Sequence, residues 1–160
     1  MADERIVPAF CIGESAPDFS AKTGDGTTVS LSEYAGSKNV VLYFYPRDDT
    51  PGCTKEACSF RDNLERLNDT GTVVIGVSVD SEKSHRSFKE KYELNFDLLS
   101  DAKHEIITKY GVQRTGKNGA SANRVTFLID KKGIVRHIWA PFNVEGHTEQ
   151  VLAKIRELEL

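Results

Sequence analysis

The sequence lacks the features of a membrane protein, a secreted disulfide scaffold or a polyanion-binding protein. Its longest apolar run, residues 40–45, has the length of a strand, whereas a bilayer-spanning helix needs about 20 apolar residues. The chain has only 3 cysteines, an odd number that is too small for a secreted disulfide scaffold. Its net charge of −3 provides no excess of positive charge for nucleic acids or anionic membranes. We therefore expect neither of these among its partners.

The N-terminus and the overall composition limit the class further. Residues 1–5 are acidic at the start and contain no apolar stretch like the core of a signal peptide, so we expect a cytoplasmic protein with reduced thiols. Hydrophobic residues make up 39% of the chain and charged residues 28%, which is typical of a globular protein rather than a disordered one. The length of 160 residues predicts a single domain over 1–160.

Hydrophobic patterning predicts alternating strands and helices. Residues 39–45 and 73–79 are nearly continuous apolar runs, as expected of strands covered on both faces. Gly24, Asp25 and Gly26 form a favoured turn sequence and predict an N-terminal hairpin within 17–36. Residues 114–123, rich in Gly, Ser, Lys and Asn, are predicted to be a long exposed loop. The predicted elements are strands at 39–45, 73–79, 97–100, 125–129 and 134–139, and helices at 51–68, 82–92, 101–110 and 148–159.

The order of these elements indicates an α/β fold. A strand–helix–strand unit should place two parallel strands side by side with a right-handed crossover. A later helix and a terminal strand–strand–helix unit would add an antiparallel hairpin to the same sheet. We therefore expect a thioredoxin-like fold, with a central mixed β-sheet flanked by helices and an N-terminal β-hairpin.

The junction between the first buried strand and the next helix carries the chemistry. Pro46 ends the strand, Pro51 suits the first helical turn, and Thr50 is a plausible N-cap. Cys53 then falls in the first turn, where unpaired N–H groups and the helix dipole favour a thiolate, the nucleophilic form of cysteine. If the substrate is a peroxide, backbone N–H groups and the Thr50 hydroxyl can hold the reacting oxygens.

Helix geometry separates Cys53 from Cys58. The two residues lie about 140° apart around the helix axis, and their Cα atoms would be roughly 8.6 Å apart. A disulfide needs Cα atoms within about 7 Å and side chains that face each other. The two cysteines therefore cannot bond while both lie on one intact helix. The close pair indicates redox or metal chemistry, and two isolated core cysteines stay possible from spacing alone.

Two other functions are compatible with a cysteine at the start of a helix. A dithiol–disulfide oxidoreductase would favour a Cys-x-x-Cys motif, whereas here four residues separate Cys53 from Cys58. A thioredoxin-like module that only binds partners, or acts as a holdase, would show no rapid loss of thiols with peroxide. No zinc-ligand spacing occurs, so we expect no metal site and interpret the four histidines as ordinary residues: His85, His104, His137 and His147.

The residues around Cys53 resemble a known active site. The pattern Pro46-x-x-x-Thr50-x-x-Cys53 resembles the active-site motif of peroxiredoxins. The string 43–46 (Tyr-Phe-Tyr-Pro), continued to Cys58, resembles the peroxiredoxin Q subfamily, also called bacterioferritin comigratory proteins. The segments 16–19, 98–101 and 124–130 are similar to that subfamily as well.

This resemblance implies a catalytic set. Cys53 would be the peroxidatic cysteine and become a sulfenic acid, with Thr50 and Arg124 positioning and polarising the peroxide and Pro46 shielding the sulfur. Cys58 matches the resolving position. Glu56 is interpreted as a first-turn acid that complements the helix dipole and is a candidate to orient an arginine. Cys11 is expected to be a packed or free thiol.

The resemblance also implies the reaction and its partners. The protein would reduce hydrogen peroxide and organic hydroperoxides, in antioxidant defence and redox homeostasis. The intramolecular disulfide between Cys53 and Cys58 would be reduced by thioredoxin or a similar dithiol protein. Members of the subfamily are often monomers, so we expect a monomer, and no metal or organic cofactor is implied.

Overall fold

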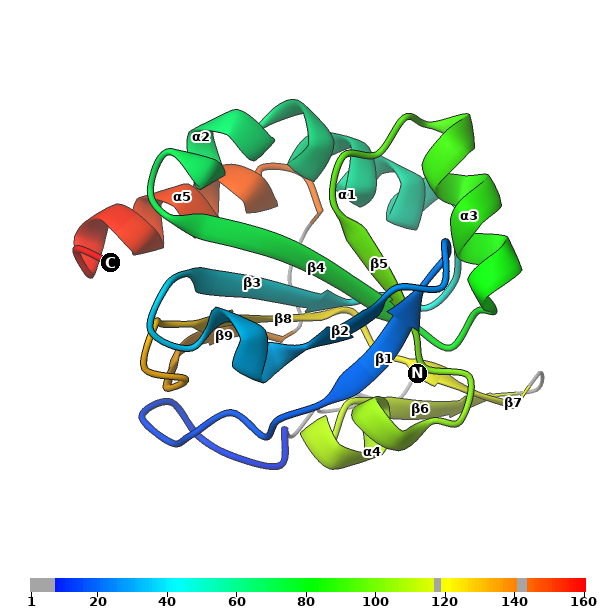
Figure 1. Ribbon diagram of the computed structural model, residues 1–160, viewed down its shortest axis with the longest axis horizontal. Helices are drawn as coiled ribbons and strands as arrows, with labels where there is room; N and C mark the ends of the chain where they lie inside the picture. Colours follow the sequence, from blue (N-terminus) through cyan, green and yellow to red (C-terminus); the bar gives the residue numbers. More distant parts are fainter. Residues whose placement is uncertain (1–7, 117–118, 141–143) are drawn as a thin grey trace.

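The computed structural model of the protein describes residues 8–116, 119–140 and 144–160. Figure 1 shows a central twisted sheet with helices on both sides. The strands are β1 (Ser20–Thr23), β2 (Thr28–Ser30), β3 (Asn39–Phe44), β4 (Thr72–Ser78), β5 (Asp97–Ser100), β6 (Gln113–Gly116), β7 (Gly119–Ala122), β8 (Val125–Ile129) and β9 (Val135–Trp139). The helices are the 3₁₀ helix η1 (Leu31–Tyr34) and the α-helices α1 (Pro51–Asp62), α2 (Leu64–Asn68), α3 (Glu82–Lys91), α4 (Glu105–Tyr110) and α5 (His147–Glu157).

The main sheet has the mixed topology that the sequence predicts. Its strand order is β2-β1-β5-β4-β3-β8-β9. The strands β3, β4 and β5 run parallel to one another, whereas β8 and β9 form an antiparallel hairpin beside β3. The predicted N-terminal hairpin is confirmed, since β1 and β2 pair antiparallel at the edge of the sheet. This arrangement places the carboxyl ends of the three parallel strands at one edge, where sites form in open α/β sheets.

Alternating side chains of β3 divide the core into two layers. Val40, Leu42 and Phe44 pack on one face with residues of α4, whereas Val41 and Tyr43 pack on the other face with α1, α2, α3 and α5. This alternation follows from the two-residue repeat of a strand, and both faces are apolar because helices cover both. In Figure 1, α1, α2, α3 and α5 lie on one side of the sheet and α4 lies on the other.

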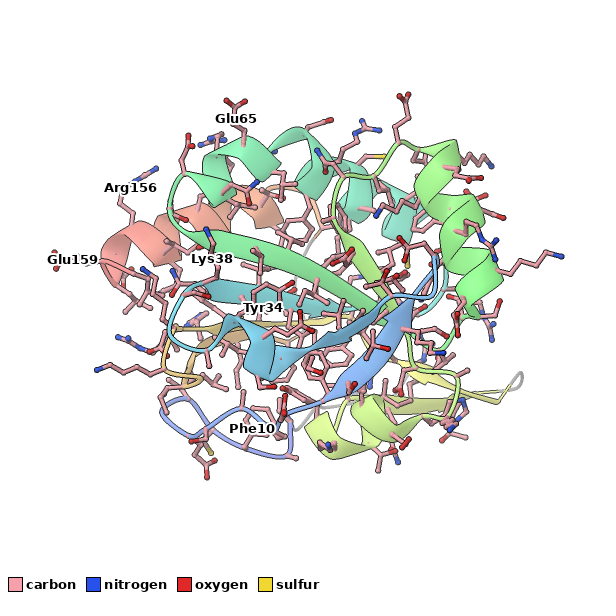
Figure 2. All side chains as sticks on the ribbon, in the orientation of Figure 1. Phe10, Tyr34, Lys38, Glu65, Arg156 and Glu159 are labelled. Carbon is pink, nitrogen blue, oxygen red and sulfur yellow. The ribbon has the colours of Figure 1, made fainter. Side chains whose placement is uncertain are left out.

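The outer surface is polar, as expected for helices that pack by one face. In Figure 2, Glu65, Arg156 and Glu159 extend away from the sheet, at the ends of α2 and α5. The apolar side of α5 is buried, with Val151 and Ile155 no more than 1% exposed. Among the described residues, no helix has the length and apolar character needed to cross a membrane.

The helix predicted over 51–68 is wrong in one respect, because α1 ends at Asp62 and α2 begins at Leu64. Asn63 breaks the helix with φ −112° and ψ 10°. Its side-chain amide donates to the Ser59 carbonyl at 2.8 Å and so competes with the helical backbone pattern.

The predicted loop over 114–123 is also wrong, since β6 and β7 pair antiparallel with Gln113 opposite Ala122. All four residues of β6 are exposed. No alternation between apolar and polar residues therefore marked this strand in the sequence.

The helix predicted over 101–110 begins later, at Glu105. The Asp101 carboxylate accepts the backbone N–H groups of Ile106 and Ile107, at 3.0 and 2.8 Å. Asp101 thus caps α4 from outside the helix. The sequence pattern could not distinguish this role from a place in the first turn.

Candidate active site

Cys53 lies in the first turn of α1, as the sequence predicts. Its side chain faces the sheet and the residue is only 1% exposed. Ala57 and Phe60, on the same face of α1, are fully buried, and Leu67 of α2 continues this apolar surface. The apolar face of the helix therefore directs the thiol inward, toward the end of β3, and keeps it away from bulk water.

Arg124, which directly precedes β8, lies close to this thiol. The antiparallel register pairs Val125 of β8 with Phe44 of β3, so the preceding residue lies beside the point where β3 ends. One guanidinium nitrogen of Arg124 lies 3.2 Å from Cys53 Sγ, and the other donates to Glu56 Oε1 at 2.6 Å. The planar fork of an arginine presents two N–H donors in a fixed geometry to two acceptors, whereas the single ammonium nitrogen of a lysine has no such fork.

Gly52 makes room for this guanidinium. A Cβ atom at position 52 would lie 3.2 Å from Arg124 Nη2, closer than most such contacts in proteins. The absence of a side chain therefore lets the arginine approach the first turn of α1.

The charges of Arg124 and Glu56 depend on each other. Burial disfavours the charged guanidinium, but the neighbouring Cys53 sulfur and the Glu56 carboxylate raise the pKa of Arg124 overall. Burial raises the pKa of Glu56 to about 7, and the attraction of Arg124 opposes this rise only in part. The result is a cation held between a buried thiol and a buried acid.

Thr50 occupies the N-cap position of α1, but its side chain makes no capping hydrogen bond. Its hydroxyl instead donates to the Arg47 carbonyl at 3.1 Å. The hydroxyl hydrogen is therefore used within the loop, which leaves the oxygen's lone pairs to accept a hydrogen from a bound molecule. Pro46, in the same loop, is half-buried.

The other two cysteines are not brought to Cys53. All three thiols are free, with Cys58 half-buried and Cys11 exposed. Cys58 lies five residues along the same helix from Cys53, which agrees with the expectation that an intact helix keeps the two sulfurs unbonded.

The interpretation of all histidines as ordinary residues gave no indication of the contacts that His85 makes. This residue of α3 is fully buried, and its Nδ1 lies 2.7 Å from Asp48 Oδ2. Asp48, Asp80 and His85 form a cluster of residue types that could bind a metal ion, but both ring nitrogens of His85 already face protein oxygens. A signal for the cluster was present, because Asp48 and Asp80 each follow a buried strand at its carboxyl end.

His147, at the start of α5, is buried as well. Its Nε2 lies 2.9 Å from Thr126 Oγ1. Burial lowers the pKa of His147 to about 4, so this ring is neutral at physiological pH. No spacing in the sequence distinguished it, because its burial depends on the packing of α5 against β8.

Comparisons with known proteins agree with this geometry. Residues 12–138 match the AhpC/TSA family. The chain is 44% identical over 151 residues to peroxiredoxin Bcp of Bacillus subtilis, covering 92% of this chain and 96% of the relative. It is 46% identical over 147 residues to the chloroplastic peroxiredoxin Q of Triticum aestivum, covering 91% and 67% of the two chains.

A solved structure shows the same fold. The chain matches PrxQ of Xylella fastidiosa with a TM-score of 0.88 and 31% sequence identity, covering 94% of this chain and 98% of the other. This likeness confirms the predicted thioredoxin-like fold.

Proposed function

We propose, from the premise that the chain belongs to the AhpC/TSA family and within it to the peroxiredoxin Q and Bcp group, that Cys53 is the peroxidatic cysteine and Cys58 its resolving partner. The protein is a thiol-dependent peroxidase of this family. The observation that carries the assignment is the 3.2 Å contact between Arg124 and the sulfur of Cys53 at a buried helix start.

In the first step, the Cys53 thiolate attacks one oxygen of the hydroperoxide. The O–O bond breaks, the sulfur becomes a sulfenic acid, and the other oxygen leaves as water or an alcohol after it takes up a proton. Arg124 donates to the oxygens in the transition state, and Thr50 accepts the O–H hydrogen of the peroxide, which fixes its orientation. Pro46 shields the sulfur from water.

In the second step, the Cys58 thiolate attacks the sulfenic sulfur of Cys53. A disulfide forms and the sulfenic oxygen leaves as water. Because both residues lie on α1, the helix between them has to unwind before the sulfurs can meet. A dithiol protein such as thioredoxin then reduces the disulfide by exchange.

The substrate and setting follow from this cycle as parts of the same proposal. Hydrogen peroxide and organic hydroperoxides are the substrate class, and the bacterioferritin comigratory protein of Xanthomonas campestris has been described for alkyl peroxide reduction. A cycle that consumes dithiol reductant requires a reducing compartment such as the cytoplasm. We propose that the 160 residues act as a single domain and a monomer, because both cysteines of the cycle lie on one helix.

The test is a count of free thiols after one equivalent of hydrogen peroxide, by alkylation and intact mass. Wild type should lose two thiols rapidly and yield a peptide in which Cys53 is linked to Cys58. Cys53→Ser should keep its remaining thiols, and the matched control Cys11→Ser should lose two, like wild type. Persistence of all three thiols in wild type would contradict the assignment of Cys53.

A further inference from the structure

The peptide bond between Arg47 and Asp48 is held from both sides. Its N–H, which belongs to Asp48, donates to Asp80 Oδ2 at 2.8 Å, and its C=O, which belongs to Arg47, accepts the Thr50 hydroxyl at 3.1 Å. A trans peptide is planar, and its N–H and C=O point in opposite directions. A carboxylate that holds the N–H on one side therefore sets the direction of the carbonyl on the other.

Asp80 is itself fixed at the carboxyl ends of two neighbouring strands. Its Oδ2 also accepts the Ser78 hydroxyl, at the end of β4, at 2.6 Å. Its carbonyl accepts the Ser100 hydroxyl, at the end of β5, at 2.7 Å. The sheet thus provides a rigid base from which one carboxylate oxygen reaches the loop.

The Asp48 side chain gives the loop a second, buried attachment. It accepts the Tyr45 hydroxyl at 2.6 Å, the Ser84 hydroxyl at 2.8 Å and the Nδ1 side of His85 at 2.7 Å. The side chains of Asp48 and His85 are 5% and 0% exposed. Three contacts on one buried carboxylate leave the loop little freedom to rotate.

The His85 ring is held on its far side as well. Its Nε2 lies 2.9 Å from the Leu99 carbonyl oxygen, which can only accept, so this nitrogen carries a hydrogen. The contact between Nδ1 and Asp48 Oδ2, at 2.7 Å, holds the near side of the ring. The ring therefore links α3, β5 and the loop in one defined orientation.

We propose that Asp80 and His85 are positioning residues for Thr50. Asp80 aligns the Arg47–Asp48 peptide, His85 anchors Asp48, and the Arg47 carbonyl then holds the Thr50 hydroxyl with its lone pairs directed to the peroxide. This inference rests on the proposed roles of Cys53 and Thr50. Both positioning residues act on the loop, not on the sulfur.

The experiment compares two reactions of reduced Cys53, each measured by quenched-flow mixing and intact mass. Oxidation by hydrogen peroxide depends on Thr50 in the proposed mechanism, whereas the rate of alkylation by iodoacetamide does not depend on the orientation of this hydroxyl. Asp80→Ala should slow oxidation by about tenfold, the loss expected for one hydrogen bond to a bound substrate. Its alkylation rate should stay within about twofold of wild type, because the sulfur and Arg124 are untouched.

Conservative variants separate positioning from a general structural role. Asp80→Asn keeps a carbonyl oxygen toward the Asp48 N–H and should restore oxidation to within about threefold of wild type. His85→Asn keeps a donor near the Nδ1 position, toward Asp48, whereas His85→Gln keeps one near the Nε2 position, toward Leu99. The Asn variant should therefore oxidise faster than the Gln variant. These variants decide the question if Asp80→Ala does not fold.

A double variant tests the route through Thr50. Thr50→Val should slow oxidation, and adding Asp80→Ala to it should cause little further loss, since both changes remove the same contact. Lys91→Ala is the matched control, because Lys91 binds Asp49 of the same loop at an exposed position, with 2.7 Å between Nζ and Oδ2. This control should leave both rates unchanged.

Three outcomes would overturn the inference. Equal slowing of oxidation and alkylation in Asp80→Ala would mean that Asp80 acts through the sulfur or the whole fold. If the losses in oxidation rate add in the double variant, Asp80 does not act through Thr50. Normal oxidation in Asp80→Ala, with slow oxidation in Thr50→Val, would refute the inference and leave the proposed peroxidase function unaffected. A failure of wild-type Cys53 to be oxidised would instead refute the proposed function itself.

Discussion

At the N-terminal end of α1, Cys53 is 1% exposed and lies 3.2 Å from the Arg124 guanidinium, whereas Cys58, in the second half of the same helix, is half-buried. The first thiol has a cation and a buried apolar face around its sulfur. The second thiol is more exposed. One helix thus carries a protected thiol and an accessible one, and the proposed cycle requires the segment between them to change shape.

The two halves of α1 also differ in the contacts that hold them against the rest of the protein. The first half is held by the ion pair between Glu56 and Arg124. The second half is held by hydrogen bonds to groups that carry no charge: the Ser59 hydroxyl lies 2.7 Å from Thr148 Oγ1, and Arg61 donates to the Tyr92 carbonyl at 2.6 Å. In the proposed cycle, the ion pair supports the chemistry of Cys53, and the contacts of the second half oppose the unwinding that brings Cys58 to it.

Cys58→Ser removes the accessible thiol of α1 and should have a greater effect than any of the variants below. Turnover with thioredoxin should be lost, while the first reaction with peroxide proceeds at the wild-type rate and stops at a sulfenic acid, which overoxidises with excess peroxide. Intact mass after one and ten equivalents of peroxide measures both. Normal turnover would mean that Cys11 or an external thiol resolves Cys53.

Arg124→Lys keeps the charge beside Cys53 but removes the fork that bridges the sulfur and Glu56. Oxidation of Cys53 by hydrogen peroxide should fall by about 100-fold, because oriented donors to the reacting oxygens are lost. Rapid mixing of the reduced protein gives this rate. Arg136→Lys is the control, since Arg136 pairs with Asp130 away from this site, and Cys53 should be oxidised at the wild-type rate in this variant. Equal rates for both variants would contradict the role of Arg124.

Glu56→Gln should change how stability depends on pH. The folded state raises the pKa of Glu56 to about 7 from 4.5, so between these values the folded protein binds a proton that the unfolded chain lacks. The stabilisation from this group is complete below pH 4.5 and is lost as the pH rises through 7. The difference in unfolding free energy between pH 5 and pH 7.5 should therefore change by roughly 1–3 kcal/mol in the variant, as measured by urea unfolding.

Ser59→Ala should have a small effect, because it loosens only the second half of α1 and leaves the contacts of the first half in place. Loss of the contact with Thr148 should speed disulfide formation about fivefold without changing the first reaction, because one neutral hydrogen bond contributes about 1 kcal/mol. The rate at which the sulfenic acid is converted to the disulfide, followed by mass, reports this step. A slower conversion would show that the contact helps the rearrangement.

Local sequence signals were sufficient for much of the fold and part of the site. The apolar run of β3, the proline in the first turn of α1 and the helical spacing of Cys53, Ala57 and Phe60 depend on nearby residues alone, and the structure confirms each. The strands β6 and β7 have no apolar alternation, so their pairing could not be predicted. Arg124 was assigned by resemblance to a family, because no local pattern marks it.

Local features of the sequence place a cysteine at the start of a helix directly after a buried strand, since caps, prolines and hydrophobic periodicity act over a few residues. The surroundings of that cysteine depend instead on contacts between distant parts of the chain. Strand register brings Arg124 to its sulfur, and the packing of α3 buries His85 against Asp48. These contacts join residues 71 and 37 positions apart, where the distance between side chains depends on the whole fold and not on spacing along the chain.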